Sequence, residues 1–230
     1  MNLRSVSGAC ASLALSCAAA LGAGAASPYL GRPFADAVHK GGPQEIPGKV
    51  QCAYYDLGGE GVAYHTVDTR NKGSGALNPA NGTYLNEFRM NEAIGTSYTK
   101  LHDAIDFNPY DLVKPPMDQL YVGWTTPGEW FNITVNVDHG GSYAVDLLYT
   151  SNRGGKIALD LNGNALVPGI DIVSTASPAE PIPWRQWHHW NVMRNIATVE
   201  LPKGVNVLTV RIVTEGNMNL ASLDFRPAAR

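Results

Sequence analysis

Cysteine is scarce in this chain, and its scarcity limits how the fold can be stabilised. The three cysteines are Cys10, Cys17 and Cys52. The first two lie in an apolar N-terminal run, so a domain that begins after this run keeps Cys52 alone and can form no internal disulfide. We expect such a domain to be stabilised by its hydrophobic core or by a bound metal ion.

Charge is sparse as well. Charged residues make up 16% of the chain and the net charge is -3. This balance lacks the basic surface that binding to nucleic acid or to an anionic membrane requires, so we expect no nucleic-acid partner. No stretch offers four turns of helical periodicity, whereas the 24 glycines and 15 prolines suit turns. The composition favours many short β-strands over a helical bundle.

Motifs typical of several enzyme classes are missing. The sequence has no Gly-x-Ser-x-Gly elbow for a nucleophilic serine, and no Walker or dinucleotide-binding glycine pattern. His188 and His189 are adjacent, so on a strand they would project to opposite faces and could not form a two-histidine metal face. A glycosidase needs two carboxylates at a cleft. The candidates lie in a long loop, where a solvated surface role is usual: Glu87, Glu92, Asp103 and Asp106. We therefore expect no catalytic activity.

Residues 1–25 have the features of a secretory signal peptide. Arg4 is the only early charge, a run of small apolar residues begins at Ala9, and Ala23-Gly24-Ala25 has the pattern of a signal-peptidase site. A membrane-spanning helix is the alternative, but the run is barely long enough and no stop-transfer cluster follows. The residues before Cys17 only loosely resemble a lipoprotein cleavage box, which disfavours a lipid anchor. We expect a protein secreted to the extracellular space or the periplasm, without membrane insertion.

The rest of the chain divides into a linker and one domain. Residues 26–45 are rich in proline and glycine and show little periodicity, which is typical of a linker. Within residues 46–227, short segments have strand-like alternation or composition: 50–55, 129–137, 143–150, 156–161, 196–201, 205–214 and 220–225. Residues 71–116 contain no convincing long strand. We expect them to form an extended loop on the surface that borders a binding site.

Tryptophan is concentrated in one place, with three of the chain's five tryptophans between Trp184 and Trp190. If this segment is a strand, each of its faces carries both indole and polar groups. Such a surface suits a sugar, because the C–H face of a pyranose stacks on an indole while amides and imidazoles reach its hydroxyls. The alternative is that all three are core or rim tryptophans of a sandwich.

Five segments follow the order of motifs found in family 6 carbohydrate-binding modules, and the resemblance spans roughly residues 46–227. They are Ile46-Pro47-Gly48-Lys49-Val50-Gln51, residues 55–65, Val122-Gly123-Trp124-Thr125 with Gly128-Glu129-Trp130, Trp184-Arg185-Gln186-Trp187, and Asn219-Leu220 with Leu223-Asp224-Phe225. The resemblance implies an all-β fold, a β-jelly-roll sandwich of two antiparallel sheets. It also implies binding of a polysaccharide or oligosaccharide without cleavage, in a module often attached to a glycoside hydrolase or secreted alongside one.

The family resemblance also implies a binding site in the loops at one end of the sandwich. There two aromatic residues clamp a sugar, and these correspond to Trp124 and Trp184. An asparagine, here Asn219, would bond the sugar hydroxyls. Trp187 corresponds to a packing residue. Beside these residues, Glu129 suits a carboxylate that fixes a turn, and Trp130 a core indole.

Related modules hold a structural calcium ion through acidic residues of the first and last strands. Here the first-strand positions are Gln51 and Ala53, and Asp224 is the acid that remains. An amide oxygen can ligate calcium, but the lost carboxylate charge would weaken the site. The resemblance thus leaves a doubtful calcium site at Gln51 and Asp224.

Two other functional classes stay open, because a sandwich does not dictate its use. The chain could be an accessory or truncated part of a glycoside hydrolase, or a structural or adhesive surface domain. We expect a monomer that binds polysaccharide, and the sequence does not fix which sugar it binds.

Overall fold

The chain folds into a β-sandwich of two sheets that enclose the main hydrophobic core. The computed structural model describes residue 1 and residues 28–229, so all but the first residue of the predicted signal peptide lies outside the described part. The first sheet has the order β1 (Gln44–Ile46), β6 (Trp130–Val137), β11 (Gly204–Thr214), β8 (Gly155–Leu161) and β9 (Asn164–Ile172), with β3 (Tyr64–His65) beside β6. The second has the order β10 (Asn191–Leu201), β7 (Gly141–Ser151), β12 (Met218–Pro227), β5 (Leu120–Val122) and β4 (Thr96–Tyr98), with β2 (Gly48–Gln51) beside β12.

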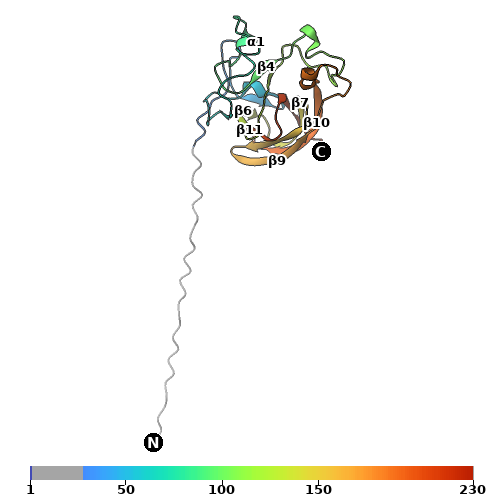
Figure 1. Ribbon diagram of the computed structural model, residues 1–230. Helices are drawn as coiled ribbons and strands as arrows, with labels where there is room; N and C mark the ends of the chain where they lie inside the picture. Colours follow the sequence, from blue (N-terminus) through green and yellow to red (C-terminus); the bar gives the residue numbers. More distant parts are fainter. Residues whose placement is uncertain (2–27, 230) are drawn as a thin grey trace.

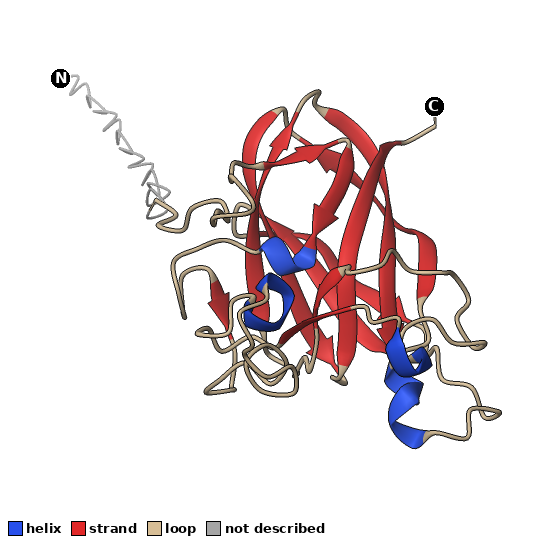
Figure 2. Ribbon diagram, turned by 90° about the horizontal axis from the view of Figure 1, so that it is seen from above, coloured by secondary structure: helices blue, strands red, loops and turns tan. Residues whose placement is uncertain are grey.

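The chain crosses repeatedly between the sheets, as in a jelly roll, and its helical segments are short. These are η1 (Cys52–Tyr54), α1 (Tyr84–Glu87), η2 (His102–Ala104) and η3 (Pro183–Trp187). Figure 1 shows α1 and β4 at one end of the molecule, away from β9, and Figure 2 shows the helical turns outside the strands. Among the described residues, no helix has the length and apolar character needed to span a membrane.

The predicted sandwich is confirmed, with one departure in strand direction. The strand pairs are antiparallel except for β1, which runs parallel to β6. The chain changes sheet immediately after β1, at Pro47, since β2 pairs with β12 in the other sheet. Proline has no N–H to donate to a β-ladder, which explains why the pairing with the first sheet ends at this point.

Most of the predicted strands are present, and the differences have local causes. The predicted strand 50–55 ends at Gln51, where η1 begins, and β10 begins at Asn191 rather than at 196. Strand β9 has no counterpart among the strands that the sequence predicts, and it contains Pro168. It lies at the edge of its sheet, where a missing N–H is tolerated.

Strand β6 shows how the core is built from alternation. Its apolar face is almost completely buried and consists of Phe131, Ile133, Val135 and Val137. The opposite, polar face is also covered near its middle. Asp56 accepts hydrogen bonds from the backbone N and the hydroxyl of Thr134, at 2.8 and 2.7 Å. The chain that follows η1 therefore packs on the outer face of the first sheet.

Part of the predicted linker, residues 26–45, packs against the domain. Arg32 forms backbone hydrogen bonds with Leu57, and β1 begins within the segment at Gln44. A second apolar cluster contains Phe34, Ala53, Phe88 and Leu120. Burial of an aromatic ring stabilises the attachment by about 2 kcal/mol, so this segment is held to the domain rather than spacing it from another.

Residues 71–116 are less of a surface excursion than the sequence indicated. Ile94 belongs to the main core, and β4 extends the second sheet. The buried side chain of Asn71 ties the segment together, because its Oδ1 accepts from the backbone N of Gly73, Ser74 and Thr96. Asparagine oxygen atoms close such turns readily. Deleting the whole segment would therefore remove part of the core.

The fully buried tryptophan of the 184–190 segment is Trp190, whereas Trp187 is only partly buried. Trp190 packs on the outer face of the second sheet, edge-on to Tyr121 at 5.4 Å between ring centroids. Its Nε1 donates to Asp106 Oδ1 at 2.8 Å, and its carbonyl accepts from the backbone N of Leu112 and Val113. The packing role predicted for Trp187 thus belongs to Trp190.

We expect Trp190→Ala to lower the free energy of unfolding by about 3 kcal/mol or more, since it leaves a large cavity and removes one of the two donors to Asp106 Oδ1. Trp187→Ala is the matched control and should cost clearly less, because its indole is partly solvated. Urea unfolding of both variants measures the two values. Equal losses would contradict this assignment.

Candidate functional site

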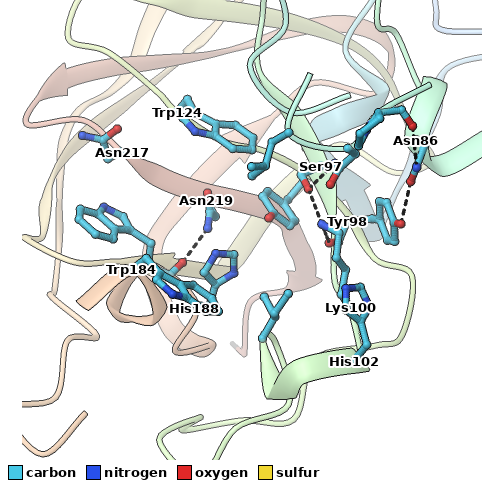
Figure 3. A pocket seen from close by; sticks show the side chains of 16 residues that line it. Asn86, Ser97, Tyr98, Lys100, His102, Trp124, Trp184, His188, Asn217 and Asn219 are labelled. Carbon is cyan, nitrogen blue, oxygen red and sulfur yellow. Dashed lines mark hydrogen bonds between the residues drawn. The ribbon is translucent and has the colours of Figure 1, made fainter. Parts of the chain in front are cut away.

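Trp124, Trp184 and Asn219 line one pocket, with a volume of about 700 Å³. They come from three separate places: the loop after β5, the turn η3, and strand β12. In Figure 3 the two indoles lie on either side of the Asn219 amide. The structure therefore brings together the three residues that the sequence singled out.

Trp124 has an unusual backbone, with φ of 53° in the left-handed region. A bulky residue there costs about 1–3 kcal/mol, and such strain is concentrated at functional sites. Two glycines make room for the indole. A Cβ on Gly73 would lie 2.6 Å from Trp124 Cζ3, and a Cβ on Gly95 would lie 3.0 Å from its Cε3. The surrounding chain is thus shaped to hold this ring in place.

Asn219 presents a fixed amide at the base of the pocket. Its Nδ2 donates to Thr150 Oγ1 at 3.0 Å and to the backbone carbonyl of Trp187 at 2.7 Å. These bonds occupy both N–H groups and orient the side chain, which is nearly buried. Among the described residues its Oδ1 accepts no hydrogen bond. This oxygen can therefore accept one from a ligand hydroxyl.

Trp184 lies on a 3₁₀ turn and not on the strand that the sequence predicted. Pro181 and Pro183 have no N–H and cannot donate to a sheet ladder. The segment therefore does not form a strand, and its aromatic and polar residues do not alternate between two faces of a sheet. The turn leaves the Trp184 side chain 49% exposed. Its ring is perpendicular to the His188 ring, at 6.1 Å between centroids.

An internal ion pair holds the turn. The Glu180 carboxylate accepts from Arg185 Nε at 2.7 Å and Nη2 at 2.9 Å, and from the backbone N of Ile182 at 2.9 Å. The His189 ring lies against the same carboxylate, at 3.3 Å. The hydrogen bonds from Arg185 lower the pKa of Glu180 to about 2. The pair fixes the turn that carries Trp184 without touching the pocket.

The Glu180 pKa, lowered from its ordinary value of 4.5, predicts how stability varies with pH. Because the folded pKa lies below the unfolded one, the pair stabilises the fold above about pH 4.5, and this contribution is lost as the pH falls toward 2. We expect Glu180→Gln to lower the melting temperature at pH 6, and the difference from the parent protein to shrink between pH 4.5 and 2. Thermal melts over this range measure it; a constant difference would contradict the assignment.

His188 also lines the pocket and was not singled out for binding. Its Nδ1 lies 2.8 Å from Asp106 Oδ1, and Asp106 is completely buried. A carboxylate accepts hydrogen bonds, so Nδ1 carries the hydrogen and the other ring nitrogen is left to the surroundings. Asp106, expected on a solvated loop, is instead the acceptor that orients this ring.

The 71–116 segment supplies most of the opposite wall. The pocket residues that come from it are Leu77, Asn78, Pro79, Asn86, Ser97, Tyr98, Lys100, His102 and Ile105. The segment that the sequence predicts to border a binding site thus borders this pocket. No sequence motif marks the individual residues, and the only signal was the density of polar and aromatic residues in a long segment without strands.

Glu129 and Trp130 lie outside this pocket, whereas Trp187 is among the residues that line it. Glu129 fixes a turn as predicted, since its Oε2 accepts from the backbone N of Thr126 at 2.8 Å. Trp130 is only partly buried, because it points to the outer face of β6, opposite Phe131. Trp130 is therefore a surface-lining residue of the sheet and not a core indole.

Gln51, which the resemblance marks as a calcium ligand together with Asp224, has oxygens that accept hydrogen bonds within the protein. The Gln51 side-chain oxygen accepts from Gln119 Nε2 at 2.7 Å, and its backbone oxygen accepts from Gln44 Nε2 at 3.1 Å. Asp224 lies opposite Lys49 in the ladder, two residues from the position opposite Gln51. Among the residues described, no three His, Cys, Asp or Glu side chains group as metal ligands would. Calcium needs six to eight oxygen ligands, and this pair does not supply them.

We expect chelation to leave the melting temperature of the protein nearly unchanged, because stabilisation by a ligand requires that the native state bind it. Thermal melts with EDTA, and with EDTA plus excess calcium, measure the effect. A drop of several degrees that calcium reverses would show that a calcium site exists.

Comparison with known proteins gives matches at the level of structure alone. No protein-family model matches the chain, and a search of curated protein sequences finds no match. The solved structures to which it is similar include carbohydrate-binding modules of family 6, the family that the sequence resembles, and of family 35.

Three of the matched structures show the range of sequence identity and coverage. A β-1,3-glucan-binding family 6 module from Bacillus halodurans is 14% identical, and the match covers 80% of this chain and 99% of that one, with a TM-score of 0.48. A family 35 module from Clostridium thermocellum is 21% identical over 58% of this chain and 88% of that one, with a TM-score of 0.41. A family 43 arabinoxylan arabinofuranohydrolase from Bacillus subtilis is 12% identical, and the match covers 85% of this chain and 33% of that one, with a TM-score of 0.48. Because every one of these TM-scores lies below 0.5, the evidence for function has to come from the pocket.

Proposed function

We propose that this protein binds a polysaccharide or oligosaccharide without cleaving it, and that one sugar ring stacks between Trp124 and Trp184. The observation that carries the proposal is the convergence of two indoles and one free amide oxygen, from three distant segments, on a single pocket. Indole faces take the C–H surface of a sugar ring, and the Asn219 oxygen accepts from a hydroxyl at its edge. The protein acts as a secreted monomer.

The pocket chemistry supports binding rather than hydrolysis. Its lining contains no aspartate or glutamate, whereas glycosidases flank the scissile bond with a pair of carboxylates. The carboxylates once considered for this role are placed elsewhere. Asp106 is buried behind His188, Glu92 pairs with Arg89, and Glu87 accepts from the backbone N of Gly82.

A glycan array on the mature protein tests the proposal and identifies the sugar. A pull-down with insoluble polysaccharides, with reducing-sugar release measured in the same samples, separates the remaining classes. Binding without release supports the proposal. Release would make the chain part of a hydrolase, and the absence of any glycan binding would leave a structural or adhesive role.

We expect Trp184→Ala to weaken binding by about 2 kcal/mol, roughly thirtyfold, because it removes one stacking surface of the clamp. Its effect on stability should be small, since the side chain is half exposed. Trp130→Ala is the matched control: it removes an indole outside the pocket and should leave the affinity unchanged. Isothermal titration with a glycan from the array measures both. Unchanged binding by Trp184→Ala would refute the stacking role.

A further inference from the structure

The pocket has a second end with a different chemistry. Figure 3 shows Lys100 and His102 on the side away from the two indoles. Lys100, His102 and His188 are the ionisable nitrogen bases of the lining, and the lining has no carboxylate to balance them. The chain as a whole is acidic, with a net charge of -3, so the charge at this wall differs in sign from that of the molecule.

The Lys100 ammonium is held in place by neutral groups. Its Nζ donates to Ser97 Oγ at 3.1 Å and to the Tyr98 carbonyl at 3.4 Å, and it lies 4.4 Å from the centre of the Tyr98 ring. Among the described residues it forms no ion pair. An ammonium has three N–H donors, so one remains for a ligand.

Burial lowers the pKa of Lys100, and the nearby Asp106 opposes this shift. Asp106 is not its direct partner in the structure, and the oxygens of Asp106 accept from Trp190, His188 and the backbone N of Lys100 itself. A partly buried cation without an anionic partner is costly. A ligand that brings a negative charge to this wall would relieve that cost.

We propose that the pocket selects an anionic sugar, in which a carboxylate or a sulfate ester pairs with the Lys100 ammonium while the ring stacks on the indoles. This inference rests on the proposed function and adds the class of ligand. A charge-assisted hydrogen bond in a partly enclosed site is about twice as strong as a neutral one. The anionic sugar should therefore bind clearly more tightly than the same sugar without its charge.

Matched pairs of ligands isolate the charge. Oligogalacturonate and its methyl ester have the same ring and differ in the carboxylate, and a sulfated galactan and the neutral galactan make the corresponding pair for sulfate. In isothermal titration we expect the charged member of at least one pair to bind about tenfold or more tightly than its neutral partner. The preference should decline as sodium chloride is raised from 0.05 to 0.5 M, on the order of the screening expected for exposed charges.

Three variants assign the preference to one side chain. Lys100→Met keeps the apolar stem and should abolish the preference for the charged member of each pair. Lys100→Arg keeps the charge and should retain a preference. Lys203→Met removes an exposed lysine outside the pocket and should behave as the parent protein.

The outcomes separate this inference from the function on which it rests. Equal binding within both pairs, or a preference that survives in Lys100→Met, overturns the anionic class while stacking on the indoles stands. If no glycan binds at all, both proposals fail. If Lys100→Met does not fold, the salt dependence of the parent protein and the Lys100→Arg variant decide: no charge preference in the parent overturns the inference.

Discussion

The buried carboxylate of Asp106 is the constraint on which the pocket depends. Its Oδ1 accepts from Trp190 Nε1 and His188 Nδ1, and its Oδ2 accepts from the backbone N of Lys100. A fully buried charge without partners would be destabilising by several kcal/mol, so these donors are needed for the fold itself. They come from both walls of the pocket. The interactions that compensate the buried charge therefore also join the two walls of the pocket.

The walls differ in how firmly they hold the residues proposed to bind sugar. Asn219 is fixed by the ladder of β12 and by two hydrogen bonds. Trp124 is fixed by a strained backbone and by the space that Gly73 and Gly95 leave. Trp184 has only its turn and the Glu180–Arg185 pair beneath it. Preorganised groups lose less entropy on binding, so in the proposed site Trp124 would be the fixed platform and the half-exposed Trp184 the side that adjusts to a ligand.

Much of the fold could be predicted from the sequence, because alternation reports burial directly. Phe131, Ile133 and Val135 occupy the core face of β6 that their spacing predicts. The same reasoning gave a wrong prediction for the tryptophan segment, residues 184–190, which was expected to be a strand. Prolines at 181 and 183 turn it into a 3₁₀ helix, and the packed indole is Trp190 rather than Trp187. The site was found only in part for a similar reason. Trp124, Trp184 and Asn219 carry motif signals, whereas the role of Lys100 depends on contacts made by distant parts of the chain.

Burial lowers the pKa of Lys100, and Asp106 opposes this shift. A negative charge behind the wall favours the ammonium through space, as its effect on the Lys100 pKa indicates. The hydrogen bonds that Asp106 accepts come from His188, Trp190 and the backbone, so the carboxylate does not draw the Lys100 Nζ away from the pocket. Direct pairing of Asp106 with the Lys100 ammonium would have neutralised the positive charge that faces the pocket. One buried carboxylate therefore bonds to residues of both walls and also favours the charged form of Lys100.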